Sequence, residues 1–164
     1  EPPISRGFTP SVYSVLPKLL ERSGASDKGT ITGLYTVLVE GDDMNEPIAD
    51  TARGILDGHI VLSRNLASAN HYPAIDVLQS VSRLMKEVAS KEHSTMAGEI
   101  RKNMAAYRDS KDLIQIGAYK QGTDAQIDRA IALHPQIDRF LCQGVEEDPP
   151  FDEVVSQLLA IGEG

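Results

Sequence analysis

Residues 29–41, GTITGLYTVLVEG, carry the clearest strand signal in this chain. The segment is rich in Thr, Val, Ile, Leu and Tyr and lies between glycines, which is typical of a buried strand. A helix over roughly 47–56 and a short strand over 59–63 are predicted to follow it. Strand, helix and strand within about 35 residues indicate a parallel α/β unit, because parallel strands need a crossover between them.

A helix is predicted before this unit. Thr9 followed by Pro10 is a helix-start signal, since a capping hydroxyl precedes the imino acid that the first helical position tolerates. Apolar residues then recur at helical spacing from Val12 to Leu20. Pro17 is expected to kink or break this helix, because its ring removes one backbone hydrogen bond.

The second half of the chain carries only helical signals. An apolar face recurs over 96–107, Thr123 and Gln126 fit a capping box, and an apolar stripe follows over 127–134. A last helix is predicted over about 151–160. The predicted domains are residues 1–85, with α/β structure, and residues 86–164, all helical.

Composition and charge argue against a nucleic-acid partner, an internal disulfide and a membrane span. The chain has 16 Lys plus Arg against 24 Asp plus Glu, a formal net charge of -8, which repels a phosphate backbone and argues against nucleic acid as a partner. Cys142 is the single cysteine, so an internal disulfide is excluded and a reducing compartment is favoured. No apolar run approaches the roughly 20 residues of a membrane span, and no signal peptide opens the chain. We therefore expect a cytoplasmic protein, and the start at Glu1 without methionine indicates a fragment.

The acidic turn EGDDMNEP, residues 40–47, is the strongest local cluster of charge. It follows a predicted strand, where α/β sheets place their ligands. The carboxylates of Asp42, Asp43 and Glu46 suit Mg²⁺ or Ca²⁺, but their spacing lacks the order of a calcium loop. Two interpretations stay open: a solvated turn, or a loop that docks another protein.

No complete active site is predicted from the residues. The four histidines are far apart in sequence and have no cysteine at ligand spacing, so no metal site is expected. Cys142 has no basic neighbour in sequence that would favour a thiolate. The phosphate-loop pattern G-x-x-x-x-G-K-[ST] does not occur. Arg83, at the end of AIDVLQSVSR, is either a surface residue in a salt bridge or a contact to a phosphate supplied from elsewhere.

Three segments of the chain resemble the C-terminal part of the flagellar type III protein-export ATPase family. They are EPPISRGFTPSVYSVLPKLLERSG, GTITGLYTVLVEGDDMNEPIADTARGILDGHIVLSR and HYPAIDVLQSVSRLM. IGAYKQGTDAQIDRAI, residues 116–131, is similar to the family more loosely. The family is related to the ATPases of injectisome-type secretion systems and to the α and β subunits of rotary F-type ATP synthases.

The resemblance implies a fold and a nucleotide site. Residues 1–85 would be the C-terminal part of a RecA-like P-loop ATPase core, with parallel strands and helices, and residues 86–164 a helical C-terminal domain. ATP and Mg²⁺ would be bound mainly by residues upstream of this chain, so the isolated fragment is expected to be inactive. Arg83 matches the arginine finger that reaches the γ-phosphate on a neighbouring subunit, and Tyr72 and Phe151 match aromatic residues beside the adenine.

The resemblance also implies partners. The whole protein would form a homohexamer that hydrolyses ATP to energise protein export, with unfolded proteins as substrates and export regulators as partners. It would be cytoplasmic and peripherally associated with the inner-membrane export apparatus and its export gate. Asp42, Asp43, Asn45 and Glu46 would face a coiled-coil stalk protein, and residues 117–122 are a second candidate for that contact. The alternatives are an injectisome or rotary ATPase subunit, or a docking module for stalk and regulator proteins without chemistry.

Overall fold

A computed structural model describes residue 2 and residues 7–162 of the chain. Residues 1 and 3–6, which belong to the first segment of the family resemblance, lie outside the described residues. Contacts between residues divide the chain into two units, Glu1–His59 and Ile60–Gly164, so the division falls inside one short strand. The predicted domain boundary between residues 85 and 86 stays a prediction.

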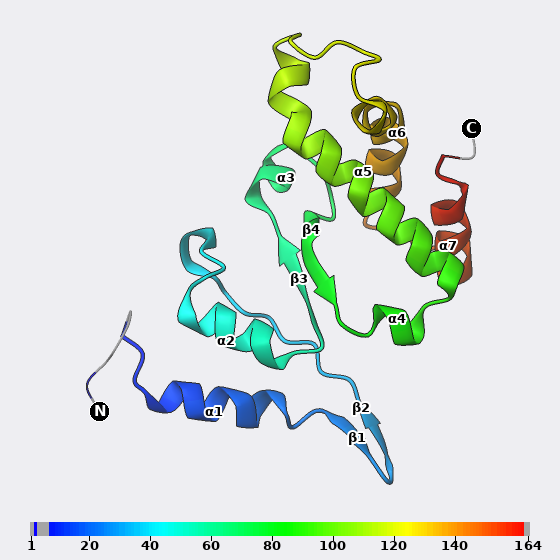
Figure 1. Cartoon of the computed structure of the whole chain (residues 1–164). Helices are drawn as coiled ribbons and strands as arrows, with labels where there is room; N and C mark the ends of the chain where they lie inside the picture. Colours follow the sequence, from blue (N-terminus) through cyan, green and yellow to red (C-terminus); the bar gives the residue numbers. More distant parts are fainter. Residues whose placement is uncertain (1, 3–6, 163–164) are drawn as a thin grey trace. The chain divides into compact units, whose positions relative to one another are not determined.

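The first unit combines two helices with a small hairpin. Helix α1, Ser11–Leu20, packs against helix α2, Pro47–Ile55, where Leu20, Ala49 and Ala52 are buried. Strands β1, Gly24–Ser26, and β2, Gly29–Ile31, pair in antiparallel register, and the 3₁₀ turn η1 covers Glu40–Asp42 (Figure 1). The predicted helix over 47–56 is therefore confirmed.

The strand predicted over residues 29–41 is formed only at its first three residues. Residues 32–39 belong to no strand, and the side chains of Leu34 and Leu38 are each 91% exposed. A strand persists only where a neighbour takes up its backbone N–H and C=O groups. Among the described residues the strand at 58–62 pairs instead with residues 75–82, so the parallel unit predicted over 29–63 is not formed.

The ends of two helices differ from their predicted caps. Pro10, rather than Thr9, is the N-cap of α1, and the Thr9 hydroxyl lies 2.7 Å from Ser11 Oγ. Pro17 lies inside α1, which stays a continuous helix. Helix α6, Ala125–Leu141, is capped by the Asp124 carboxylate, which accepts from the backbone of the second and third helical residues. A carboxylate is a stronger cap than the Thr123 hydroxyl, because an ionised acceptor interacts favourably with the helix dipole.

The second unit begins with a two-stranded ribbon. Strands β3, Gly58–Leu62, and β4, Ile75–Ser82, are neighbours that run in opposite directions in Figure 1. Helix α3, Arg64–Ser68, lies in their connection, and the Ser63 hydroxyl caps it. Strand β4 was not among the predicted elements, because the polar residues inside AIDVLQSVS interrupt the alternation that identifies a strand.

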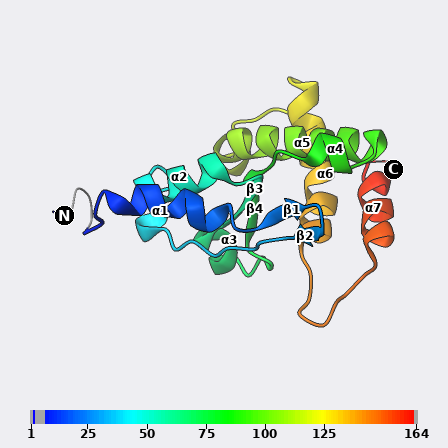
Figure 2. The same ribbon diagram turned by 90° about the horizontal axis from the view of Figure 1, so that it is seen from below.

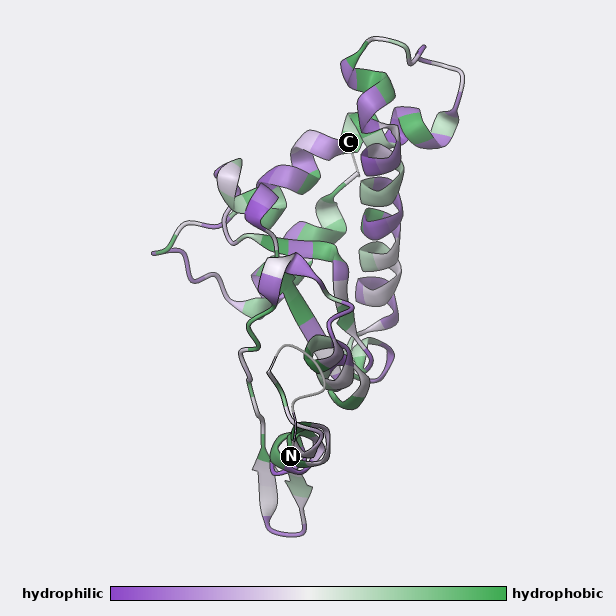
Figure 3. Cartoon of the chain, turned by 90° about the vertical axis from the view of Figure 1, so that its left-hand side faces the viewer, coloured by the Kyte–Doolittle hydropathy of each residue, from purple (hydrophilic) through white to green (hydrophobic). Residues whose placement is uncertain are grey.

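Helices make up the rest of this unit, as predicted. They are α4, Met85–Val88, α5, Lys91–Gln115, α6, and α7, Phe151–Ala160. Helix α5 packs against α6 and α7 around a core of Ile100, Ile137, Leu158 and Ile161. In Figure 2 a long loop joins α6 to α7, and in Figure 3 hydrophilic residues recur along α5. The order of elements confirms the predicted class, α/β followed by helices.

Helices α5 and α6 also meet through a ring pair. The rings of Tyr107 and His134 are stacked, with centroids 3.7 Å apart and an interplanar angle of 17°. Burial lowers the pKa of His134, and the nearby Lys111 lowers it further, although Asp138 acts in the opposite direction. The neutral imidazole is the form that such a half-buried apolar contact favours.

Of the helices that the structure describes, none has the combined length and apolarity that crossing a lipid bilayer requires.

Candidate functional site at the end of β4

Arg83 follows β4 directly and is exposed. The strand ends at Ser82, and α4 begins two residues after the arginine, so Arg83 lies in the short bend that joins the ribbon to the helices. A guanidinium at such a place remains charged at any ordinary pH and can donate to two oxygens of one anion. How precisely the Arg83 guanidinium can be positioned against an anion depends on how rigidly β4 is held.

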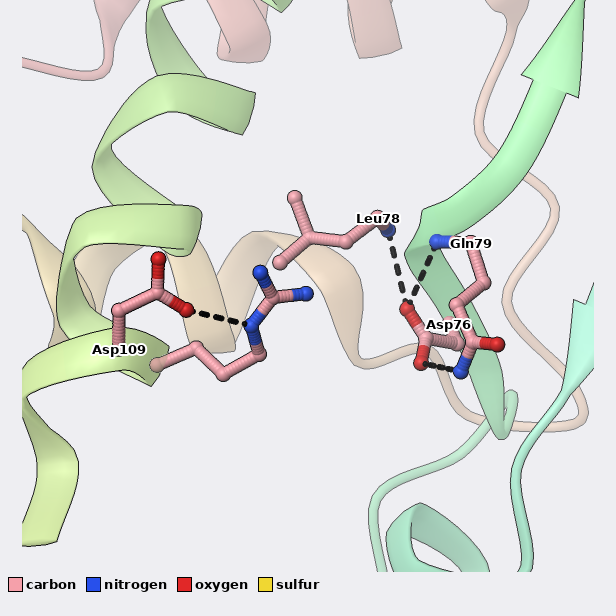
Figure 4. Close-up of polar contacts among 5 residues, drawn as sticks. Asp76, Leu78, Gln79 and Asp109 are labelled. Carbon is pink, nitrogen blue, oxygen red and sulfur yellow. Dashed lines mark hydrogen bonds and ion pairs between the residues drawn. The ribbon is translucent and has the colours of Figure 1, made fainter.

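The first restraint on β4 is local and centres on Asp76. Its Oδ1 accepts from the backbone N–H of Leu78 at 3.0 Å and of Gln79 at 3.1 Å, and its Oδ2 accepts from Gln79 Nε2 at 2.7 Å (Figure 4). The Ser80 hydroxyl donates to the Asp76 carbonyl and accepts from the backbone N–H of Val61 on β3. These bonds replace part of a regular ladder and fix an irregular strand.

The second restraint comes from Arg101 on α5. Its guanidinium donates to the carbonyl oxygens of Val77, Leu78 and Ser80, the latter two at 3.2 Å. One planar group therefore joins three backbone acceptors of β4 to the helix. Arg101 was not among the predicted site residues, although a sequence signal exists. It stands at helical spacing between Ala97 and Met104, on the face of α5 that packs against the core.

The two aromatic candidates lie at different ends of β4. Tyr72 is exposed, three residues before the strand, and its carbonyl accepts from the Gln143 backbone N–H at 2.8 Å. Phe151 is exposed at the start of α7, with its ring 6.1 Å from that of His93. Phe151 also lines a hollow of about 480 Å³ together with Ser82 and Arg101, so it belongs to the Arg83 end.

The acidic turn of the first unit is tightly built. Gly41 and Asp42 both have left-handed backbone conformations, with φ of 63° and 59°, and Asp43 Oδ1 accepts from the Asn45 backbone N–H at 3.1 Å. Aspartate and asparagine tolerate this conformation better than most residues. Asp42, Asp43 and Asn45 are exposed, but Glu46 is only 5% exposed. The surface of the turn is therefore formed by three of the four predicted stalk-facing residues.

The second predicted contact segment, residues 117–122, is held by Asp128 of α6. Its Oδ1 lies 2.8 Å from the Tyr119 hydroxyl, and its Oδ2 accepts from the Gly122 backbone N–H at 2.8 Å. Gly117, with φ of 70°, ends α5 in the left-handed conformation that glycine adopts without strain. Partial burial raises the pKa of Tyr119, and the hydrogen bond to Asp128 raises it further. The loop is thus ordered by a residue that the sequence analysis did not single out.

Two family matches cover most of the chain. Residues 1–82 match the ATP synthase alpha/beta family, nucleotide-binding domain, and residues 89–160 match the T3SS EscN ATPase C-terminal domain. The flagellum-specific ATP synthase of Bacillus subtilis strain 168 is 53% identical over 161 residues, which are 98% of this chain and 37% of that protein. The chain thus spans a little over a third of the length of this curated relative.

Solved structures agree with these matches. The assembled ATPase EscN of the enteropathogenic E. coli type III secretion system is 46% identical, with a TM-score of 0.93 over 98% of this chain and 39% of that chain. The same ATPase in complex with its central stalk EscO is 44% identical, with a TM-score of 0.86 over 98% of this chain and 38% of that one. These similarities confirm the predicted class, an ATPase core segment followed by a helical C-terminal region.

Proposed function

This chain belongs to the ATP synthase alpha/beta family, in the branch of the flagellar and type III secretion ATPases, and from that premise we propose that the whole protein hydrolyses ATP to energise protein export. The observation that carries the proposal is the exposed Arg83 at the end of a strand that Asp76 and Arg101 hold in place. Within this function, Arg83 is an arginine finger that acts on the nucleotide of a neighbouring subunit.

The position of β4 supports action between subunits. Tyr72 lies before the strand and Arg83 after it, and eight residues at about 3.3 Å each span roughly 25 Å. One chain is therefore poorly suited to place both side chains on a single nucleotide. In the proposed assembly Tyr72 packs beside the adenine of its own subunit's nucleotide, and Arg83 approaches the γ-phosphate of the next. A cation fixed beside the transferring phosphoryl group stabilises the charge that shifts in the transition state.

The nucleotide itself would be held mainly by residues outside this chain. The residues present fit a supporting role, since they offer an exposed guanidinium and two exposed aromatic rings, Tyr72 and Phe151. ATP with Mg²⁺ supplies the phosphoryl group and the charge neutralisation that its transfer requires. The arginine completes that environment, and Tyr72 excludes water from the base. Phe151 lies at the other end of β4 from Tyr72, so the two rings of one chain do not cover the same base.

The test of a shared active site is the dependence of activity on assembly. We expect the rate of phosphate release per subunit of the whole protein to rise with protein concentration and to level off as oligomers form, because each nucleotide then gains an arginine from a neighbour. Phosphate release and light scattering are measured on the same samples. A rate per subunit that is constant from monomer to oligomer would contradict the shared site.

We further propose that the acidic turn contacts a coiled-coil stalk protein in a cytoplasmic, membrane-peripheral export complex. Support comes from the exposure of Asp42, Asp43 and Asn45 and from the similarity to the EscN ATPase, whose structure is known with its central stalk EscO. Charged residues at the rim of an interface guide the approach of the partner without adding tight apolar contacts. Such an interface suits a partner that rotates or slides against it. Residues 117–122 are the second candidate surface for the stalk or for export regulators.

A double substitution, Asp42→Asn with Asp43→Asn, tests this contact. Asparagine keeps the left-handed conformation at 42 and an acceptor oxygen at 43, so the turn is retained while two negative charges are lost. We expect stalk stimulation of ATP hydrolysis to need a several-fold higher stalk concentration, mostly at low salt, because exposed charges are screened.

The matched control is Asp112→Asn, an exposed carboxylate on α5. It should leave the stimulation curve unchanged, and hydrolysis without the stalk should be the same in all three proteins. Equal loss of stimulated and unstimulated activity in the double variant would show instead that the turn serves folding or catalysis.

A further inference from the structure

Three side chains with metal-binding atoms converge at the end of α6. His71 Nδ1 lies 3.1 Å from Asp138 Oδ1 and 3.4 Å from Cys142 Sγ, and the three atoms all lie within 4.8 Å of one another. Asp138 and Cys142 are four residues apart at the last turn of the helix, so they share one face. His71 is 67 positions from Asp138 in sequence, and only the tertiary fold brings it to that face.

The backbone around the cluster is tied on both sides. The Gln143 N–H donates to the Tyr72 carbonyl at 2.8 Å, directly beside Cys142 and His71 in the sequence. The His71 N–H donates to the Leu66 carbonyl at 2.9 Å, and the Cys142 N–H to the Asp138 carbonyl at 3.2 Å. A site whose ligands are held in this way loses little conformational entropy when it binds an ion.

Hydrogen bonds alone leave the three side chains of this cluster poorly satisfied. The Nδ1 atom of a neutral imidazole carries either one proton or one lone pair, yet a carboxylate and a thiol both face it. A cation between the three atoms would bond to each of them. The side chain of His71 is 10% exposed and that of Asp138 is 55% exposed, and Cys142 lies at the surface, so one ligand is anchored inside while an ion can enter from solvent.

We propose that His71, Asp138 and Cys142 form a zinc-binding site with a fourth position open to water. Nitrogen, thiolate and carboxylate ligands together suit Zn²⁺, whereas Mg²⁺ and Ca²⁺ prefer oxygen alone. Bonds of about 2.0 to 2.3 Å in tetrahedral geometry separate the ligand atoms by roughly 3.4 to 3.6 Å. The separations of 3.1 and 3.4 Å from His71 Nδ1 are close to these values, and the Asp138 and Cys142 atoms, which lie within 4.8 Å of each other, are brought to this spacing by side-chain rotation. Binding releases the thiol proton to solvent.

Occupancy of this site would restrain one segment that the proposed function uses. The ion would fasten the segment that carries Tyr72 to the C-terminal end of α6, in addition to the single backbone bond from Gln143. The proposal itself rests only on the geometry of the cluster. It holds or fails independently of ATP hydrolysis, because its test is a measurement of metal binding.

The test is a Co²⁺ titration of the whole protein after removal of bound metal with a chelator. We expect one equivalent of Co²⁺ to give thiolate-to-cobalt charge-transfer absorption and tetrahedral visible bands, and Zn²⁺ to displace it. Cys142→Ser should abolish the charge-transfer absorption. Asp138→Asn and His71→Gln should each raise the dissociation constant at least about tenfold, since a ligand is lost.

The matched control is again Asp112→Asn, which should bind Co²⁺ like the unsubstituted protein. Circular dichroism shows whether each variant is folded; if His71→Gln is not, the surface variants Asp138→Asn and Cys142→Ser decide. Absence of the charge-transfer absorption in the unsubstituted protein would overturn the proposal. The same absorption in Cys142→Ser, or an unchanged dissociation constant in Asp138→Asn, would also overturn it.

Discussion

Replacement of Arg83 by alanine is expected to lower ATP hydrolysis by the assembled whole protein about 10³- to 10⁵-fold. The side chain is exposed at the end of β4, so its loss removes a charge without opening a cavity. An arginine finger acts on the transition state more than on the bound nucleotide, and ATP binding should therefore change little. Phosphate release under saturating ATP and equilibrium binding of a fluorescent nucleotide measure the two quantities separately.

A mixing experiment distinguishes action in trans from a general loss of function. Subunits with Arg83→Ala are combined with subunits whose phosphate loop is inactivated. Each population alone should be inactive, but at mixed interfaces an intact arginine meets an intact phosphate loop and part of the activity should return. The control substitution, Arg129→Ala on α6, removes another exposed arginine and should leave turnover unchanged. Unchanged turnover in Arg83→Ala itself would refute the assignment.

Replacement of Arg101 by alanine is expected to lower the free energy of unfolding by about 2 to 3 kcal/mol. The guanidinium is half-buried and donates to three carbonyls of β4, and alanine leaves those acceptors without their charged donor. Water reaches part of the site, which keeps the loss below the sum of three separate bonds. Urea unfolding followed by circular dichroism measures the change.

Two further substitutions make the Arg101 result specific. Lysine at 101 keeps the charge but cannot reach three carbonyls with one planar fork, so Arg101→Lys should recover only a minor part of the lost stability. On the same helix Arg108 pairs with Asp109, which is labelled in Figure 4, and both side chains are more than half exposed. Arg108→Ala should therefore cost no more than about 1 kcal/mol. Equal destabilisation by Arg101→Ala and Arg108→Ala would contradict the restraint on β4.

The Arg101 substitution also bears on the function. If Arg101 positions the strand that leads to Arg83, then turnover of the assembled protein should fall in Arg101→Ala at temperatures where the variant is fully folded. Nucleotide binding should be retained, because Arg101 contacts backbone carbonyls of its own chain. This split between turnover and binding identifies a positioning residue, which a purely structural role would not produce.

Helices were predictable from sequence because their signal is local. Apolar residues repeated every three to four positions over 96–107 and 127–134, and these segments lie in α5 and α6 and contribute to their packed faces. The exact helix caps were less predictable: α6 is capped by Asp124, one residue after the predicted cap Thr123. Several side chains near a helix start can accept the same N–H groups, and their competition depends on backbone angles that a sequence pattern does not contain.

Strands were harder to predict from sequence than helices, because a strand forms only where a neighbouring strand pairs with its backbone. Residues 29–41 have strong strand propensity, yet 32–39 pair with no strand among the described residues, and Leu34 and Leu38 stay exposed. Residues 75–82 have a weaker pattern but form β4, since β3 lies beside them and Asp76, Ser80 and Arg101 satisfy the remaining backbone groups. Strand propensity describes how well a residue fits a pleated, half-buried sheet. The neighbouring strands that make up such a sheet come from elsewhere in the chain.

The sequence by itself determined the longer helices and the place of Arg83 directly after AIDVLQSVS, because each of these depends on neighbours within a few turns of chain. The class of the fold was indicated by the longer segments that carry the family resemblance. Only the tertiary structure decided that Arg101 holds β4, that Glu46 is buried beside an exposed turn, and that His71 meets Asp138 and Cys142. Those contacts join residues that are far apart in sequence or depend on which face of an element is covered. Packing selects the faces that meet, and no local pattern records that selection.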